Sequence, residues 1–443
     1  EEEGYIIRNI PVPQATNKGQ YTTMKIIQRP DVKYDGKTLF EDVSTLVDYM
    51  TDEKGERAPR YLYPESMDSK RLLVKFRDNG GLEKDGLVQI RRGVPDLSLG
   101  ESNYAQVRIL VDNDYYIKGM AVYGRDEDFP KGVDVIFNTN KDSSEGKLGA
   151  LKSIKKNLAK DPNNPFGSAI IPGINEPDND IGGGQSYYIG KDGKKHLSLI
   201  NKRADEGEWG GWSKELPSQM LGKQPKSTIE RQLSLAKLQK DEEYKEILEV
   251  TNPTIKRAML KDFAEKADKA AEELKAAPFP GQKYQVILPL ETIRDNECYA
   301  PNYENGQKLA LIRYPHAGTF EIPVVTVNNK NKEGIEVITP SAKDAMGINA
   351  KTAGILSGAD FDGDTVMVIP LQPDKFAITT QDPLPGLLGF DPTVEYGPDP
   401  KLSYEDKNGV RHCFRNGVEY PLMDEGAKQT QVGVISNLIT DMT

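Results

Sequence analysis

The stretch Ser357-Gly-Ala-Asp360-Phe-Asp362-Gly-Asp364-Thr-Val-Met-Val-Ile-Pro370 places three aspartates at alternate positions, directly before an apolar run. Carboxylates this close raise one another's pKa unless a cation neutralises them, and their oxygens suit a hard divalent ion such as Mg²⁺. Positions i, i+2 and i+4 of an extended segment share one face, and Gly363 permits the tight turn that lets the three side chains converge. Residues 366–369 are typical of a buried strand that anchors the loop. The stretch therefore predicts a Mg²⁺ site, which Mn²⁺ can also fill, on Asp360, Asp362 and Asp364.

Other acidic loops match this run only in part. An EF-hand calcium loop needs Gly at its sixth position and Glu at its twelfth, where this chain has Thr365 and Leu371. A phosphotransferase of the haloacid-dehalogenase type would use Asp362 as nucleophile and Asp364 as acid. That family has a strand before the first aspartate and a loop and helix after it, whereas here the strand is expected after the loop. A solvated acidic turn without function stays open.

The run resembles the metal-binding signature of the two-barrel RNA polymerases, Asn-Ala-Asp-Phe-Asp-Gly-Asp in the cellular largest subunits. In that family the three aspartates hold the catalytic magnesium at the bottom of a double-psi β-barrel. The family also carries an arginine and a proline on an earlier strand of the same barrel, and Leu309-Ala-Leu-Ile-Arg313-Tyr-Pro315 stands at that place here. The resemblance implies that Arg313 approaches the sugar of the incoming nucleotide or the primer end. An exposed arginine at a strand end is the alternative.

The same family has a sister barrel whose lysines contact the nucleotide phosphates and the RNA end. The matching residues here are Ile117-Lys118-Gly119-Met120-Ala121, then Arg125, then Pro130-Lys131-Gly132-Val133. The resemblance implies catalytic roles for Lys118 and Lys131, although Gly119 and the acidic insertion 126–128 alter the family's spacing. Lysine charges beside a metal suit phosphoryl transfer, which depends on positioning and on neutralising developing charge. The alternative is that both lysines are ordinary surface residues.

The remaining reactive residue types favour no competing chemistry. The three histidines are widely spaced, and Cys298 and Cys413 have no partner at metal-ligand spacing, so zinc and disulfide frameworks have little support. The glycine run at 182–184 lacks the lysine and the serine or threonine of a Walker loop. A two-metal phosphoryl transfer, in contrast, needs no nucleophilic side chain, because the ions activate the RNA 3′ hydroxyl and steady the leaving pyrophosphate.

Composition limits the class of protein. The 443 residues suffice for two or three domains, and 37% hydrophobic residues suit a water-soluble fold. No stretch is long and apolar enough for a membrane span, and the acidic start Glu1-Glu-Glu is unlike a signal peptide, so we expect a cytoplasmic location, in a bacterial host if the protein is phage-encoded. The net charge of −10 argues against a protein that coats DNA nonspecifically.

The pattern of segments predicts an α+β fold with two double-psi β-barrels linked by an irregular segment and a helical hairpin. We expect strands at 71–76, 87–90, 107–111 and 134–137 in the first barrel, and at 284–288, 309–312, 324–327, 335–338 and 366–369 in the second. A hairpin is expected around Lys191-Asp192-Gly193. Two helices follow, one beginning at Ser227 with a capping box and one at Asn252-Pro253.

These segments define five expected parts of the chain. They are an N-terminal segment at 1–60, the lysine barrel at 61–145, the linker with the helical hairpin at 146–282, the aspartate barrel at 283–385, and a helical tail at 386–443. The tail resembles the segment that follows the aspartate barrel in silencing polymerases. Because the chain runs on to its end without a helix stop signal, we expect part of a larger polypeptide.

Both family motifs lie on one chain, whereas cellular polymerases divide them between subunits. We therefore expect the catalytic core of a single-chain RNA polymerase of the phage, mobile-element or silencing kind. Its partners would be NTPs, an RNA product and a nucleic-acid template, with DNA favoured over RNA. Two alternatives remain: a barrel that binds nucleic acid or metal without synthesis, and a magnesium-dependent phosphohydrolase that acts on small substrates without a template.

Overall fold

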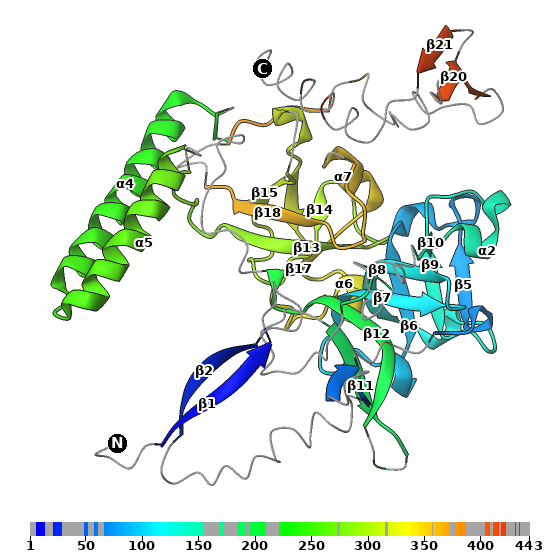
Figure 1. Cartoon of the computed structure of the whole chain (residues 1–443). Helices are drawn as coiled ribbons and strands as arrows, with labels where there is room; N and C mark the ends of the chain where they lie inside the picture. The colour runs from blue at the N-terminus through cyan, green and yellow to red at the C-terminus, as the bar shows by residue number, and fades with distance from the viewer. Residues whose placement is uncertain are drawn as a thin grey trace.

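Two main β-sheets and a protruding helical hairpin make up the computed structural model of the chain, which is a mixed α+β fold as expected (Figure 1). The structure describes residues 6–13, 21–28, 48–51, 57–60, 66–154, 166, 169–171, 184–191, 193, 195–209, 221–222, 224–272, 275–314, 318–356, 358–372, 378–383, 385, 404–407, 411–415, 418–421, 430 and 434. Near the N-terminus, β1 (Ile6–Pro13) pairs antiparallel with β2 (Tyr21–Gln28), and β3 (Asp48–Thr51) with β4 (Arg57–Arg60).

The first main sheet has the strand order β11-β12-β7-β8-β6-β9-β5, with β10 paired to β8. Its strands are β5 (Leu72–Lys75), β6 (Leu87–Arg91), β7 (Tyr104–Val111), β8 (Tyr115–Gly124), β9 (Val135–Asn138), β10 (Lys152–Ser153), β11 (Gly184–Ile189) and β12 (Lys195–Asp205). The short helix α2 (Gly146–Gly149) precedes β10. All four strands expected here are confirmed, and β11 with β12 forms the expected hairpin. A parallel bridge between Met67 and Val111 ties the start of this region to β7.

The second main sheet has the order β14-β16-β15-β18-β13-β17. Its strands are β13 (Lys283–Pro289), β14 (Glu297–Cys298), β15 (Lys308–Ile312), β16 (Val324–Val327), β17 (Ala345–Ile348) and β18 (Thr365–Pro370). A bridge between Tyr299, just after β14, and Gly347 of β17 joins the two edge strands, so this sheet nearly closes on itself. Two α-helices lie in this region, α6 (Lys332–Val337) and α7 (Ala350–Ile355).

The strand expected at 335–338 is wrong, because most of this segment belongs to α6. The Asn331 side chain accepts a hydrogen bond from the Gly334 backbone N–H and caps the helix. Adding a Cβ to Gly334 would bring it within 2.4 Å of the Tyr299 ring, so the helix packs closely against the strand region. The capping and this close approach override the β-branched run Ile335-Glu-Val-Ile338.

Each main sheet has its own apolar core, and a third core joins the two. The first core includes Val107 and Ile117, and the second includes Leu311 and Phe361. Between the sheets, Tyr104 and Met120 of the first pack with Val286 and Leu288 of the second. The joining core fixes how the two sheets meet, and it lies beside the predicted aspartate loop.

The buried polar anchor of this joining core is Asp344. The Tyr104 hydroxyl donates to the Asp344 carboxylate at 2.8 Å, and the backbone N–H of Trp209 donates to the same carboxylate at 2.8 Å. A carboxylate that is only 2% exposed is stable inside a protein when several donors satisfy it.

The helical hairpin consists of α4 (Lys226–Glu249) and α5 (Pro253–Glu272), which stand out from the side of the second sheet (Figure 1). The start expected for the second helix at Asn252-Pro253 is confirmed. The Asn252 side chain caps α5, because it accepts hydrogen bonds from the backbone N–H groups of Thr254 and Ile255. The capping box at Ser227 is wrong. Helix α4 begins one residue earlier, after Pro225, without a side-chain cap, since Pro225 supplies an extended residue before the first turn.

The described part of the expected helical tail is a three-stranded sheet, formed by β19 (Tyr404–Glu405), β20 (Arg411–Arg415) and β21 (Val418–Pro421). The sequence between β20 and β21 is Asn-Gly, the strongest signal for a two-residue hairpin loop. The tail is therefore not helical at 404–407, 411–415 and 418–421. Of its segment with helical spacing, 427–441, the structure describes only residues 430 and 434, and both are helical. Among the described helices, none has the length and apolar character needed to cross a membrane.

Candidate metal centre

The three aspartates converge in a short loop between α7 and β18. One carboxylate oxygen from each of Asp360, Asp362 and Asp364 lies within 4.8 Å of the others. The loop holds its own shape, because the Asp360 N–H donates to Asp364 Oδ2 at 3.1 Å and the Asp362 N–H donates to Asp360 Oδ1 at 3.1 Å. Gly363 has φ +123°, a backbone conformation that L side chains rarely adopt. The expected convergence on one point is thus present in the fold.

Phe361 fastens the loop to both sheets. Its ring is 2% exposed and packs in the core of the second sheet. Its backbone N–H donates to the Asp85 carbonyl of the first sheet's region at 2.8 Å. From β7, the Gln106 side chain donates to the Asp362 carbonyl at 2.9 Å. A Cβ on Gly86 would lie 2.6 Å from the Asp362 nitrogen, so the two backbones meet where only glycine fits.

Burial and neighbouring negative charges raise the pKa of two carboxyl groups at this site. Burial and the charges of Asp362 and Asp364 raise the pKa of Asp360 above its usual range. A fourth carboxyl, Asp85, lies close enough to act on Asp360, and burial together with the Asp362 charge raises the pKa of Asp85 to about 6. A divalent cation would relieve this repulsion, and an all-oxygen donor set is what Mg²⁺ and Mn²⁺ prefer. The residues present therefore fit such an ion.

Two cations reach the aspartates, one from each sheet. Lys118 of β8 donates from Nζ to Asp362 Oδ2. Arg313, just after β15, pairs through Nε with Asp364 Oδ2 at 2.9 Å. Both ion pairs are about three-quarters shielded from solvent, with side-chain exposures of 24% and 19% for the first and 25% and 22% for the second. The predicted Lys118 and Arg313 thus share one site with the aspartates.

Lys131 lies elsewhere. It occupies an exposed turn after β8, and in the described part of the chain no contact links it to the aspartates. From Lys118 to the end of β8 at Gly124 the strand advances about 20 Å. The neighbouring carbonyls of Pro130 and Val133 accept hydrogen bonds from Arg91, which gives the turn a structural partner. The role predicted for Lys131 therefore gains no support from the geometry. Residues 315–317, which follow Arg313 and Tyr314, lie outside the described residues.

Sequence reasoning missed four residues at this site: Asp85, Gln106, Arg108 and Lys152. Arg108 is on β7 and Lys152 on β10, and the charge of Asp362 acts on both. None of the four stands in a motif that marks it in the sequence. The register of β7 with β8 and of β10 with β8 brings Arg108 and Lys152 beside Lys118, so only the sheet pairing reveals them.

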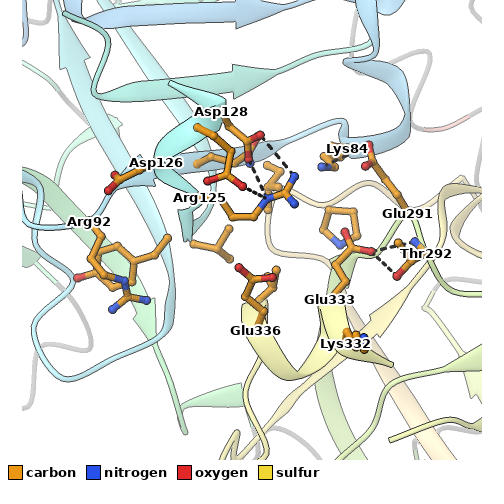
Figure 2. A pocket seen from close by; sticks show the side chains of 18 of the residues that line it. Lys84, Arg92, Arg125, Asp126, Asp128, Glu291, Thr292, Lys332, Glu333 and Glu336 are labelled. Carbon is orange, nitrogen blue, oxygen red and sulfur yellow. Dashed lines mark hydrogen bonds and ion pairs between the residues drawn. The ribbon is translucent and has the colours of Figure 1, made fainter. Parts of the chain in front are cut away.

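A cavity of about 850 Å³ also lies between the first sheet and α6, but the aspartates do not line it (Figure 2). Several of its charged side chains have partners within the lining. Arg125 pairs with Asp128 at 3.4 Å, Lys84 pairs with Glu291 at 3.3 Å, and the Thr292 hydroxyl donates to Glu333 at 2.8 Å. We regard this cavity as a polar seam between the sheets, distinct from the candidate metal centre.

Comparisons with known proteins find a likeness among solved structures. No family model matches the chain, and no curated protein matches it. Among solved structures the chain is similar to the RNA-dependent RNA polymerase QDE-1 from Thielavia terrestris, with a TM-score of 0.43 and 12% sequence identity. The alignment covers 99% of this chain and 50% of that one, so the chain spans about half the length of that structure.

Proposed function

We propose that the chain is the catalytic core of an RNA polymerase that transfers nucleotides from NTPs to an RNA 3′ end. The observation that carries the proposal is the convergence of Asp360, Asp362 and Asp364 within 4.8 Å, flanked by Lys118 from one sheet and Arg313 from the other. A carboxylate cluster beside cations matches what phosphoryl transfer requires, a place for a divalent ion next to positive charge for phosphates. The resemblance of the loop to the polymerase signature agrees with this reading.

Each residue has a role in this proposal. Asp360, Asp362 and Asp364 would hold one ion and share a second, and Asp85 is the nearest further carboxyl. When bound, such ions lower the pKa of the attacking hydroxyl and stabilise charge on the leaving pyrophosphate. Lys118 places an ammonium where a nucleotide phosphate can replace Asp362 as its partner.

The surrounding fold keeps these groups rigid. Arg313 holds Asp364 at 2.9 Å, and Phe361 anchors the loop in the core of the second sheet. Side chains that are already oriented need no reorganisation when charge develops in the reaction. This preorganisation is a main source of electrostatic catalysis. In this proposal Arg313 would also meet the sugar of the incoming nucleotide or the primer end.

The same proposal includes the two-barrel architecture. Each main sheet contains two parallel strand pairs among antiparallel ones, β5·β9 and β6·β8 in the first and β13·β17 and β14·β16 in the second. Each region also has a bridge that links distant strands, at Met67 with Val111 and at Tyr299 with Gly347. These shared features support two related barrels that face each other across the joining core.

Primer extension tests the proposal. The protein and its Asp362→Ala variant are given NTPs and an RNA primer annealed to either a DNA or an RNA template, with Mg²⁺ or Mn²⁺. Asp142→Ala, which removes an exposed carboxylate outside the site, serves as the matched control. We expect extension by the unmodified chain and by the control and none by Asp362→Ala, and we expect the DNA template to be preferred.

Two other outcomes would contradict the proposal. Phosphate release from small substrates without a template, lost in Asp362→Ala, would identify a phosphohydrolase. No extension on either template, together with metal or nucleic-acid binding, would leave a non-catalytic barrel.

A further inference from the structure

One face of the first sheet carries a row of cations that passes beside Asp362. The antiparallel register of β7 and β8 sets Arg108 directly opposite Lys118. On the other side of β8, Lys152 of β10 pairs with Tyr116. The alternation of side chains fixes the face, because Val107, Ile109 and Ile117 point into the core of the first sheet and leave Arg108 and Lys118 on the opposite side.

A β-bulge adds a fourth cation to this row. Lys202 of β12 faces Val107 and Ala204 faces Gln106, so Arg203 is an extra residue between two consecutive register positions. Bulges redirect side chains and are common beside functional sites. The charge of Arg203 acts on Arg108, which places the two guanidinium groups near each other. Four neighbouring strands thus contribute Arg203, Arg108, Lys118 and Lys152 in order.

This arrangement is unfavourable for the isolated protein. Like charges directly opposite each other destabilise a strand pair, and the partly buried Arg108 and Arg203 lose hydration. Burial and the nearby Arg203 lower the pKa of Arg108 to about 10, and burial and Lys118 lower the pKa of Lys152. Among the described residues, neither Arg108 nor Lys152 forms an ion pair, and Arg108 Nε has no hydrogen-bond partner. The charge of Asp362 acts on Arg108 and Lys152 without an ion pair to either of them among the described residues.

We infer that Arg203, Arg108 and Lys152 form a binding strip for successive phosphates of a single nucleic-acid strand that passes beside the aspartate loop. The inference rests on the proposed function for the identity of that strand. The strip crosses three strand spacings, about 14 Å, which is enough for more than one phosphate. Lys118, between Arg108 and Lys152, pairs with Asp362, so a strand bound along the strip would pass beside the reacting groups.

The strip is tested by binding, without catalysis. Fluorescence anisotropy measures the affinity of a labelled single-stranded RNA in EDTA at several salt concentrations, and unlabelled tripolyphosphate competes as a probe for nucleotide phosphates. The Arg203→Ala/Arg108→Ala/Lys152→Ala variant is compared with the unmodified protein. Each cation that neutralises a phosphate of a single strand contributes about 0.7 to the slope of log affinity against log salt, so we expect the slope to fall by about 2.

Two controls separate loss of binding from loss of fold. Arg257→Ala removes an exposed cation of the helical hairpin and should leave the slope unchanged. Arg108→Met keeps the length of the side chain and removes its charge. This single variant should bind RNA more weakly but melt at the same or a higher temperature, because it removes a poorly hydrated cation. A merely structural role for Arg108 would give a lower melting temperature instead.

The outcomes also separate this inference from the proposed function. An unchanged salt slope in the triple variant would overturn the strip, even if the protein extends primers. If the triple variant binds RNA with unchanged affinity but tripolyphosphate no longer competes, the strip would also be overturned. That result would assign these cations to the nucleotide phosphates. A reduced slope for RNA would support the strip even if extension failed, and Asp362→Ala should bind RNA at least as well as the unmodified protein.

Discussion

Asp85 makes the metal-free protein less stable at neutral pH, and removing its charge should reverse this. Burial and the Asp362 charge raise the pKa of Asp85 from 3.8 to about 6. A pKa rise of this size corresponds to about 3 kcal/mol, which partial solvent contact reduces to about 1–2 kcal/mol. Asp85→Asn keeps the oxygen that accepts the hydrogen bond from the Asn140 N–H at 3.0 Å. The variant should therefore be more stable at pH 8 by about 1–2 kcal/mol.

The sign of the pH dependence follows from the raised pKa. Below about pH 4 the Asp85 carboxyl is protonated in the folded and the unfolded chain, so the substitution should have no effect there. Between about pH 4 and pH 6 the unfolded chain binds fewer protons than the folded chain, so the folded protein loses stability as the pH rises. The gain of Asp85→Asn should grow through this interval and then stay constant.

Urea unfolding in EDTA at a series of pH values measures this gain. Asp142→Asn, at an exposed position, should show none. The gain should shrink when Mg²⁺ is added, because a bound cation stabilises the ionised form of Asp85. A variant that is less stable than the unmodified protein at pH 8, or a gain that does not depend on pH, would refute the electrostatic account of the site.

Three further results are expected. Gly363→Ala, at φ +123° and with a new Cβ 2.1 Å from Gln106 Nε2, should cost about 1–3 kcal/mol in urea unfolding and weaken Mn²⁺ binding in calorimetry; unaltered stability would contradict the geometry of the loop. Tyr104→Phe removes the donor to Asp344 and should cost about 1–3 kcal/mol in the same unfolding assay without changing Mn²⁺ affinity, whereas a weakened affinity would show that the joining core reaches the metal centre. Asp360→Asn should lower Mn²⁺ affinity at least about tenfold, and equal affinity would exclude Asp360 as a ligand.

Most strands of the two main sheets were predictable from local sequence, for a specific physical reason. Runs such as 324–327 and 366–369 are short, apolar and rich in β-branched residues, and they form β16 and most of β18. The run at 335–338 has the same composition, yet most of it is helical, because the Asn331 cap and the contact of Gly334 with Tyr299 favour α6. Local propensity is decisive only where no tertiary contact opposes it.

The expected ligands of the metal centre were likewise predictable from one stretch of sequence. Three alternate aspartates around a glycine determine an oxygen donor set for a hard cation, since spacing and chemistry are both local properties. Arg313 was predictable as a further residue of this site, because it stands in the family motif Leu309-Ala-Leu-Ile-Arg313-Tyr-Pro315.

Only the tertiary structure decided what surrounds that centre. Lys118 and Asp362 are 244 residues apart, and Gln106 is 256 residues from the carbonyl it contacts. Lys118 and Lys131 looked equivalent in the sequence, but sheet register brings Lys118 to the aspartates, together with Arg108 and Lys152, and leaves Lys131 in an exposed turn. A local pattern specifies which ligand atoms a loop offers, whereas the charges that act on them depend on strand pairing and on the packing of two sheets across a shared core.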